Sequence, residues 1–444
     1  MKITVIGGGS TYTPELINGF LARVEQLPVR EELCLMDIDK ERLDIVGGFA
    51  QRMVKAKGEP FKVTLTTNQR EAIAGASYVC TQFRVGQMQA RREDEYLGLR
   101  HGLVGQETTG IGGMAKALRT IPVILNIAKD LRETAKDALL INFTNPSGLV
   151  TEALNRYAPD VPAVGVCNVP MNTRTKYLEA LKKNTGEKID PSRAALKTLG
   201  LNHLSWNYGF AIDGEDVWNQ VMEASLKDFK PEDNHAWDPR LIRETRLIPN
   251  DYLQYYYNTT VKIKAQAAWP PSRAEAVMEL EKSLLRQYAD PARSEPPEEL
   301  SKRGGAEYST VATQLINAHY NDLGEVHVVN VRNNGAVKEW DESWVLEIPA
   351  IARCSGITPI PAEPLPPFAY GLLSAVKSYE ILTAQAAALG DRAAAYQALI
   401  VHPLGPNSNT LNKFWTTCSK PIENTCLNLN KSKVKRRKSL TFDL

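Results

Sequence analysis

The sequence predicts an α/β protein built on a parallel, doubly wound sheet. Short apolar runs alternate with helix-like segments from residue 2 to about residue 168, a glycine-rich turn follows the first run, and an acidic residue ends the second. Strands that alternate with helices usually pair in parallel, because each helix returns the chain to the edge from which it started. The 444 residues, of which 43% are hydrophobic, are enough for such a sheet and an additional lobe.

The first unit has the layout of a dinucleotide-binding site. Residues 2–6 form a buried strand, a glycine-rich turn and a helix with Pro14 in its first turn follow, and a second strand ends at Asp37. Backbone amides at such a turn receive a pyrophosphate, and the acid receives a ribose hydroxyl. The expected cofactor-binding residues are Gly7, Gly9, Ser10, Thr11 and Asp37. Tyr12 stands where a third glycine is usual, and the acid indicates NAD rather than NADP.

The alternation continues, which predicts a Rossmann-like sheet of the lactate and malate dehydrogenase kind. The expected elements are a helix at 40–55, strands at 61–67 and 77–83, a helix at 118–136 after a break at Pro122, and strands at 138–144 and 164–168. Asn145-Pro146 ends one of these strands and leaves an amide at the sheet edge. Ligands bind at that edge in open α/β sheets.

Residues 84–117 read as a long glycine-rich loop, and loops of this length are usually functional. Arg84, Arg91 and Arg92 in it are either an anion clamp or a solvated basic face.

A thiol and an imidazole stand near two predicted strand ends. Cys167 ends the strand at 164–168, and His203 lies in the segment 201–206. Together they can hold a borderline metal ion. Their separation of 36 residues is too long for a zinc knuckle. From spacing alone, a buried free cysteine and a hydrogen-bonded core histidine remain the alternative.

The second half has a less regular pattern. Its expected elements are a tyrosine-rich segment at 251–257, a long helix through Tyr288 after Trp269-Pro270-Pro271, a strand at 326–331 followed by a turn at 333–337, and helices over 369–401 divided near Gly390. The tyrosine-rich segment is either a core aromatic patch or a source of one basic hydroxyl. We predict an NAD-binding domain at 1–195, an α+β substrate-binding and catalytic domain at 196–406, and an atypical tail at 407–444.

Composition excludes several classes of protein. No run reaches about 18 apolar residues, so no membrane span is expected. The amino-terminal sequence lacks the features of a signal peptide and the six cysteines are scattered, which together favour the cytoplasm. Residues 412–444 carry eight lysines and arginines against two acids, which leaves a net charge of −4 for the rest of the chain. The positive charge of the tail is therefore no evidence that the rest of the chain binds nucleic acid.

Six motifs together resemble glycoside hydrolase family 4, and most closely its 6-phospho-β-glucosidases. The motifs are IGGGSTYTPEL at 6–16, GQETTGIGGMAKALRTIP at 105–122, NFTNPSG at 142–148, GVCNVP at 165–170, GLNHLSW at 200–206 and HVVNVRNNGAV at 327–337. The resemblance extends to about Pro406. Beyond it the lysine-rich end departs from the family pattern, and we interpret it as an altered or frameshifted end rather than a nucleic-acid arm.

The resemblance implies an unusual glycosidase chemistry, which is an exception to the two-carboxylate mechanism. Bound NAD takes a hydride from C3 of the sugar, a metal ion such as Mn²⁺ polarises the C3 oxygen, a tyrosinate removes the C2 proton, and the glycosidic oxygen leaves from C1. Water then adds, and NADH returns the hydride. The expected substrate is a phosphorylated β-glucoside such as cellobiose 6-phosphate, and the expected assembly is a homodimer or homotetramer.

The resemblance also assigns roles to residues by motif. Cys167 and His203 match the metal ligands, Tyr252 the base with Tyr256 as the second choice, and Glu107 the carboxylate that raises the basicity of the tyrosine. The residues matching substrate-contacting positions are Arg91, Asn145, Asn168 and Arg273. Asn168 stands where α-specific members carry an aspartate that donates a proton, which favours β-glycosides.

Two other functions are compatible with a dinucleotide-binding sheet. An NAD-dependent 2-hydroxyacid dehydrogenase would share the sheet order, but it requires a catalytic histidine with an acidic partner and no metal. A non-catalytic nucleotide sensor would not require Cys167, His203, Glu107 and a tyrosine together.

Overall fold

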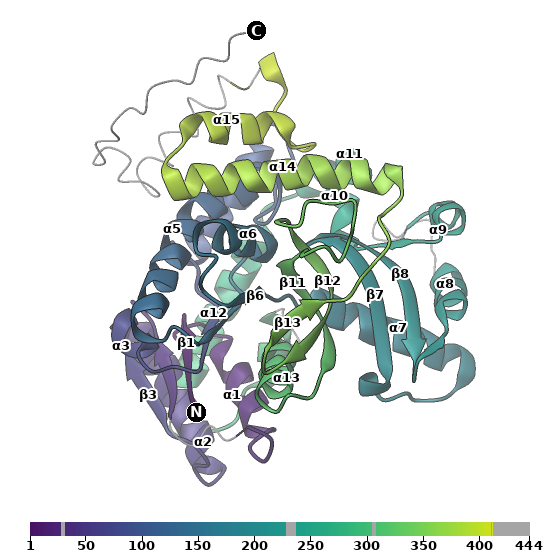
Figure 1. Cartoon of the computed structure of the whole chain (residues 1–444). Helices are drawn as coiled ribbons and strands as arrows, with labels where there is room; N and C mark the ends of the chain where they lie inside the picture. Colours follow the sequence, from purple (N-terminus) through teal and green to yellow (C-terminus); the bar gives the residue numbers. More distant parts are fainter. Residues whose placement is uncertain (28–31, 228–236, 304–307, 410, 412–444) are drawn as a thin grey trace.

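In the computed structural model, one mixed sheet of thirteen strands runs through the molecule (Figure 1). The structure describes residues 1–27, 32–227, 237–303, 308–409 and 411, so most of the predicted tail lies outside the described residues. Along the sheet the strand order is β10-β8-β7-β12-β11-β6-β5-β4-β1-β2-β3, with β13 paired to β12 and β9 to β8.

The strands from β6 to β3 are parallel and have the order 3-2-1-4-5-6 when read from the β3 edge. Their bounds are β1 Lys2–Ile6, β2 Glu32–Met36, β3 Val63–Thr66, β4 Tyr78–Thr81, β5 Leu139–Asn142 and β6 Ala163–Gly165. This order is that of a dinucleotide-binding Rossmann sheet. The predicted fold class is therefore confirmed.

The remaining strands extend the same sheet in antiparallel fashion, starting with β11 beside β6. They are β7 Ala194–Leu201, β8 Leu204–Ile212, β9 Glu215–Asp216, β10 Ile248–Pro249, β11 Glu325–Arg332, β12 Val345–Arg353 and β13 Gly356–Pro359. Since the sheet runs on from β6, the predicted domain division at residue 195 falls at the start of a strand of this common sheet. It stays a prediction.

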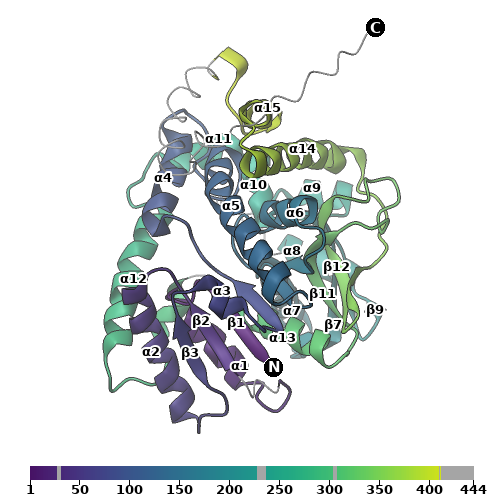
Figure 2. The same cartoon turned by 60° about the vertical axis from the view of Figure 1, so that its left-hand side comes forward.

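The helices gather in separate groups around the sheet (Figure 2). Helices α1 Thr13–Leu21, α2 Lys40–Ala56 and α13 Tyr308–Tyr320 form one group, and α3 Gln69–Ile73, α5 Gly110–Thr134 and α6 Ser147–Tyr157 form another. Helix α12 Arg273–Ala289 packs on α2 and on α4 Gln87–Leu99. Helix α14 Pro367–Leu389 lies across α5 and α6 and is covered by α15 Arg392–Val401 (Figure 1). The other helices are α7 Val169–Thr185, α8 Trp218–Lys227, α9 Pro239–Thr245, α10 Gln254–Tyr257 and α11 Thr259–Gln266, with 3-10 turns at Pro191–Arg193, Asp251–Leu253 and Glu298–Arg303.

Local sequence accounts for several helix ends. The side chain of Asp39 accepts a hydrogen bond from the Arg42 amide at the start of α2, and Ser272 and Glu275 form a reciprocal capping box at the start of α12. Gly390 ends α14 in the left-handed conformation, which confirms the predicted division of 369–401 into two helices.

The interpretation of residues 84–117 as a loop was wrong. Helix α4 occupies much of this stretch, and α5 begins at Gly110 and continues through Pro122. Glycine at position 112 is a packing requirement, because a Cβ there would lie 2.5 Å from the Asp94 carbonyl oxygen of α4 and 2.2 Å from that of Gln106. The glycines thus let α5 approach neighbouring backbone closely.

Helix α5 is, among the described residues, the one helix with the length and apolar composition of a membrane span, at a mean hydropathy of 1.2. In the folded protein 72% of the apolar 18-residue window of this helix is buried, as in the core helix of a globular protein.

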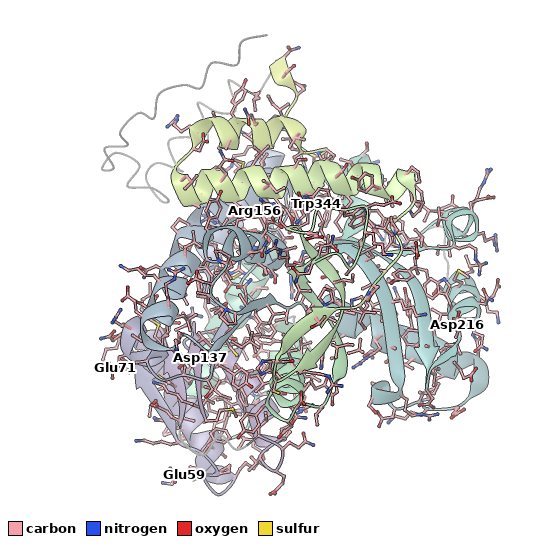
Figure 3. The ribbon with its side chains drawn as sticks, in the orientation of Figure 1. Glu59, Glu71, Asp137, Arg156, Asp216 and Trp344 are labelled. Carbon is pink, nitrogen blue, oxygen red and sulfur yellow. The ribbon has the colours of Figure 1, made fainter. Side chains whose placement is uncertain are left out.

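Helix α14 packs on α6, and Figure 3 shows Arg156 of α6 and Trp344, just before β12, below α14. Glu152 of α6 is fully buried and bonds Arg156 at 2.5 Å and Lys377 of α14 at 2.8 Å. The buried Glu152–Lys377 pair joins α6 to α14, whereas the Glu152–Arg156 pair lies within α6.

Candidate active site

The strand order reverses between β1 and β4, and the carboxyl ends of these two strands flank a crevice in this topology. Gly7 follows β1 there with φ +95°, and its backbone lies against that of Phe83 after β4. A Cβ at Gly7 would lie 2.8 Å from the Phe83 nitrogen. The turn is therefore closed to side chains, as a cradle for a pyrophosphate requires.

Asp37 organises the glycine-rich turn. Its Oδ2 accepts a hydrogen bond from the Gly9 amide at 2.9 Å, and its Oδ1 accepts one from the Asp39 amide at 3.0 Å. The adjoining Ile38 side chain is 87% exposed, which leaves an apolar surface beside the carboxylate. The carboxylate can bind a ribose hydroxyl, and the apolar side chain beside it can contact a base. This combination suits a dinucleotide.

Ser10 and Thr11 lie at the start of α1. The Ser10 hydroxyl accepts from the Tyr12 amide at 3.3 Å. Thr11 Oγ1 donates to Glu281 Oε1 at 3.2 Å and accepts from Arg303 Nε at 3.2 Å. Neither Glu281 nor Arg303 was found from the sequence, because they stand in no recognisable motif and reach the turn only through the packing of α12 and the 3-10 turn at Glu298–Arg303.

Gly7→Ala should destabilise the protein more than Gly75→Ala. Both glycines have positive φ, which costs an L-residue roughly 1–2 kcal/mol. Only at Gly7 does the new methyl group meet backbone atoms, while nothing lies within 4 Å at Gly75, so overpacking adds about 1–3 kcal/mol at Gly7 alone. The denaturation midpoint in urea measures the difference, and equal midpoints would contradict this account of the turn.

Cys167 and His203 meet although they are far apart in sequence. Cys167 follows β6, and His203 lies in the two-residue turn between β7 and β8. Cys167 Sγ is 3.5 Å from His203 Nε2. Two such ligands on one tetrahedral divalent ion such as zinc, with bonds of about 2.3 Å to sulfur and about 2.1 Å to nitrogen, lie roughly 3.6 Å apart. The pair therefore has the separation that a shared metal ion requires.

The neutral imidazole of this pair suits a metal ion, whereas the thiol would lose its proton on binding one. His203 Nδ1 lies 3.1 Å from Thr108 Oγ1, which leaves Nε2 to face the thiol. Burial lowers the pKa of His203 to about 4, so the imidazole is neutral. Burial, with a smaller contribution from Glu347, raises the pKa of the Cys167 thiol to about 12, and a bound cation would favour the thiolate.

In the described parts of the chain no group of three or more His, Cys, Asp and Glu residues is arranged to hold a metal ion. Protein ligands would thus occupy only part of a coordination sphere. Catalytic metal sites leave positions open for water or substrate in this way.

Tyr252 lies directly on the candidate metal site. Its ring stacks on the His203 ring with 3.7 Å between centroids and 10° between planes. Burial raises the pKa of Tyr252 above its usual range, Glu107 adds to the increase, and Arg91 acts in the opposite direction. Tyr256 is placed differently, because its hydroxyl lies 2.5 Å from Thr109 Oγ1.

Glu107 is the centre of a buried ion cluster. It pairs with Arg84, with Arg91 Nη1 at 3.1 Å and with Lys116 Nζ at 2.6 Å. Burial by itself would raise the pKa of Glu107, but the three cations hold it well below its usual range. Burial and the charge of Arg84 lower the pKa of Lys116 to about 7. Glu107 is therefore a fixed negative charge near Tyr252, and Lys116 was missed although it stands in the same sequence motif.

The predicted substrate residues do not all meet. Arg91 belongs to the Glu107 cluster and also bonds Glu95 at 2.7 Å. Asn168, at the start of α7, lies 3.9 Å from the Cys167 sulfur, and Asn145 accepts from the Ser147 amide at 3.4 Å. Arg273 is exposed at the start of α12 and donates to the carbonyl oxygens of residues 302 and 303. The described contacts thus join Arg273 to the segment that carries Arg303, not to the Glu107 cluster.

Comparison with known proteins assigns the chain to a family. The family model described as "Family 4 glycosyl hydrolase" matches residues 2–183, and "Family 4 glycosyl hydrolase C-terminal domain" matches residues 198–405. The chain is a family 4 glycosyl hydrolase. The motifs at 6–16 and 327–337 lie inside these two matched ranges, so the resemblance inferred from them is confirmed.

Similar proteins extend over nearly the whole of this family 4 glycosyl hydrolase. A probable 6-phospho-β-glucosidase of Bacillus subtilis is 41% identical over 423 residues, covering 93% of this chain and 94% of that protein. The 6-phospho-β-glucosidase BglT of Thermotoga maritima is 39% identical over 410 residues, covering 92% and 95%.

Solved structures agree with these matches. The Thermotoga maritima 6-phospho-β-glucosidase with NAD and glucose-6-phosphate superposes with a TM-score of 0.89 at 37% identity, covering 96% of this chain and 99% of that one. The same enzyme with manganese, NAD⁺ and glucose-6-phosphate also gives 0.89, at 36% identity. A malate dehydrogenase of Cryptosporidium parvum gives 0.53 at 12% identity and coverages of 87% and 99%, which shows a shared fold alone.

Proposed function

We propose that this family 4 glycosyl hydrolase hydrolyses 6-phospho-β-glucosides, such as cellobiose 6-phosphate, to glucose 6-phosphate and an aglycone or sugar, with no net consumption of NAD. One observation carries the proposal: the Tyr252 ring stacks on His203, whose Nε2 faces Cys167. This contact brings the residue proposed as base next to the two residues proposed as metal ligands. The two relatives named above, which are 41% and 39% identical to this chain, carry the name of this activity.

The cofactor and the metal ion have the following places in the proposal. Gly7, Gly9, Ser10, Thr11 and Asp37 hold NAD, which supplies a hydride acceptor and donor for C3 of the sugar. Cys167 and His203 hold Mn²⁺ or another divalent ion, which supplies Lewis acidity at the C3 oxygen.

The side chains of the protein supply the proton transfer and the substrate contacts. Tyr252 acts as the base at the C2 carbon, and the Glu107 carboxylate increases the basicity of the tyrosine. Arg91, held by Glu107 and Glu95, presents cationic N–H donors to the bound sugar phosphate. Asn168 beside Cys167 offers an amide, which contacts the sugar but cannot serve as a proton donor for the leaving oxygen. Asn145 is assigned to the same subsite.

The overall function is tested by following product and cofactor together. Release of glucose 6-phosphate from cellobiose 6-phosphate should require Mn²⁺ and NAD, while absorbance at the NADH wavelength shows no net accumulation. Stoichiometric NADH production would instead indicate the 2-hydroxyacid dehydrogenase alternative. His203 does not support that alternative, because its ring nitrogens face a thiol and a threonine hydroxyl, not a carboxylate.

A 6-phosphorylated β-glucoside should be preferred over the free glucoside. A hydrogen bond to a charged group contributes about 1.5–3 kcal/mol, or roughly ten- to hundredfold in affinity. Arg273→Met should narrow this preference, because the family resemblance places Arg273 at a substrate-contacting position and a guanidinium suits a 6-phosphate. Arg92→Met is the matched control, since Arg92 also lies near the protein surface but pairs with Glu93 at 3.1 Å. The ratio of kcat/KM for the two substrates is the measurement, and a ratio of one for the native enzyme would exclude a phospho-sugar substrate.

A cytoplasmic enzyme that acts as a homodimer or homotetramer, without a nucleic-acid or membrane partner, completes the proposal. The four described cysteines are free thiols, and three of them are buried, as is usual in a reducing compartment. Light scattering of the purified chain measures the assembly.

A further inference from the structure

A row of buried polar residues and glycines crosses the sheet close to Cys167 and His203, the proposed metal pair. These residues are opposed to one another on neighbouring strands, so they share one face of the sheet. From β4 to β8 the row is Thr81, Asn142, Gly165, Asn330, Glu347, Gly200 and Ser205. Gly165 of this row lies two residues before Cys167, and Gly200 and Ser205 lie on the two strands that flank the His203 turn. The one ionisable member of the row is Glu347, which is 1% exposed.

The Glu347 carboxylate bridges the two sides of the turn that carries His203. Its Oε2 accepts a hydrogen bond from Asn202 Nδ2 at 2.8 Å, and its Oε1 accepts one from Ser205 Oγ at 2.8 Å. Asn202 precedes His203 directly and Ser205 follows two residues later. One side chain of β12 therefore fixes both arms of the β7–β8 turn.

This turn needs such support because of its backbone. His203 has φ +63°, a left-handed conformation that residues with a Cβ seldom adopt. Strained residues of this kind persist where their surroundings over-determine them, and they gather at functional sites. Ser205 is held further by Asn250, whose Nδ2 lies 3.3 Å from Ser205 Oγ.

The same carboxylate is linked to the other metal ligand. The turn that Glu347 holds also faces the Cys167 thiol, because His203 Nε2 lies 3.5 Å from Cys167 Sγ. The position of the turn therefore sets the separation of the two proposed ligands. By fixing the turn through Asn202 and Ser205, Glu347 acts on the geometry of both.

We propose that Glu347 is the positioning residue of the Cys167–His203 metal site, acting through Asn202 and Ser205. The proposal rests on the metal-dependent function proposed above. Groups that orient metal ligands in this way contribute about 10–100-fold to metal affinity. The carboxylate acts by geometry: a glutamine at 347 can accept from Asn202 and donate to Ser205, whereas an alanine can do neither.

Mn²⁺ affinity of the full chain, with NAD and glucose 6-phosphate present, tests the proposal through the electron paramagnetic resonance signal of free Mn²⁺. Glu347→Ala should weaken Mn²⁺ binding about 10–100-fold. Glu347→Gln should stay within a few-fold of the native value, and both variants should bind NAD as the native chain does. Glu152→Gln is the matched control, because Glu152 is also a fully buried carboxylate, but its described partners are Lys377, Arg156 and the Val345 amide instead of Asn202 and Ser205. It should leave the Mn²⁺ affinity unchanged.

Native Mn²⁺ affinity in Glu347→Ala would overturn the proposal, and so would an equal loss in Glu347→Gln, which would indicate a role of charge. If Glu347→Ala does not fold, Ser205→Ala takes its place as the test. It removes one of the two hydrogen bonds to Glu347 through a smaller change of side chain. That variant should weaken Mn²⁺ binding, and native affinity in it would contradict the proposal. Absence of Mn²⁺ binding by the native chain would instead refute the proposed function.

Discussion

Cys167→Ser and His203→Ala are expected to abolish Mn²⁺-dependent turnover while NAD still binds. The thiol and the imidazole lie 3.5 Å apart, and in the described chain no third ligand of the usual kind stands ready to replace either of them. A Lewis acid supplies several kcal/mol of charge stabilisation. Since about 1.4 kcal/mol corresponds to a factor of ten, turnover should fall by at least roughly a thousandfold. The measurement is glucose 6-phosphate release against Mn²⁺ concentration, with NAD affinity measured by fluorescence.

Cys80→Ser is the matched control for this prediction. Cys80 is a second fully buried thiol, on β4, and its pKa is raised by burial to about 12, as that of Cys167 is. The exchange of sulfur for oxygen in a buried place is the same, but no metal ligand is lost. Cys80→Ser should therefore lower stability without changing the Mn²⁺ requirement. Full activity of Cys167→Ser with the native metal requirement would remove Cys167 from the site.

Tyr252→Phe should lower turnover by about 10²–10⁴-fold, because it removes the proposed general base. The phenylalanine ring keeps the stacking on His203, so substrate and NAD binding should survive. Exchange gives the sharper measurement: with glucose 6-phosphate in D₂O, the native enzyme should place deuterium at C2, and Tyr252→Phe should not.

Tyr256→Phe is the control, since the Tyr256 hydroxyl bonds Thr109, whereas the ring of Tyr252 stacks on His203. It should retain the exchange. The opposite pattern would make Tyr256 the base. A native enzyme that never exchanges at C2 would refute the elimination mechanism as a whole.

Much of the dinucleotide-binding half could be predicted from local patterns. Residues 2–6, the turn at Gly7 and the acid at Asp37 lie where the strand–turn–helix–strand pattern put them. Such patterns succeed because strand and helix periodicity and the conformational freedom of glycine are properties of neighbouring residues. The interpretation failed at 105–122, where glycine and proline indicated a loop and a break but α5 runs through both. The glycines there serve close packing against distant backbone, which no local pattern reports.

The candidate site was less predictable than the fold. Sequence types indicated that Cys167 and His203 could hold a metal, but their spacing left a core cysteine and histidine as the alternative. Tyrosine density at 251–257 likewise did not distinguish Tyr252 from Tyr256; the preference for Tyr252 came from motif resemblance, and the stacking on His203 is a property of the folded chain. Glu281, Arg303 and Glu347 carry no motif and became visible only through their contacts.

By itself the sequence determined the family, the parallel sheet of the first half and the set of residue types available for chemistry. These properties depend on local periodicity and on short motifs, which can be recognised from neighbouring residues alone. Only the tertiary structure decided which of those residues meet. The 3.5 Å between Cys167 and His203 depends on the pairing of β6 with β11, β11 with β12 and β12 with β7. Strand pairings are set by the packing of the whole core, and no short stretch of sequence contains that information.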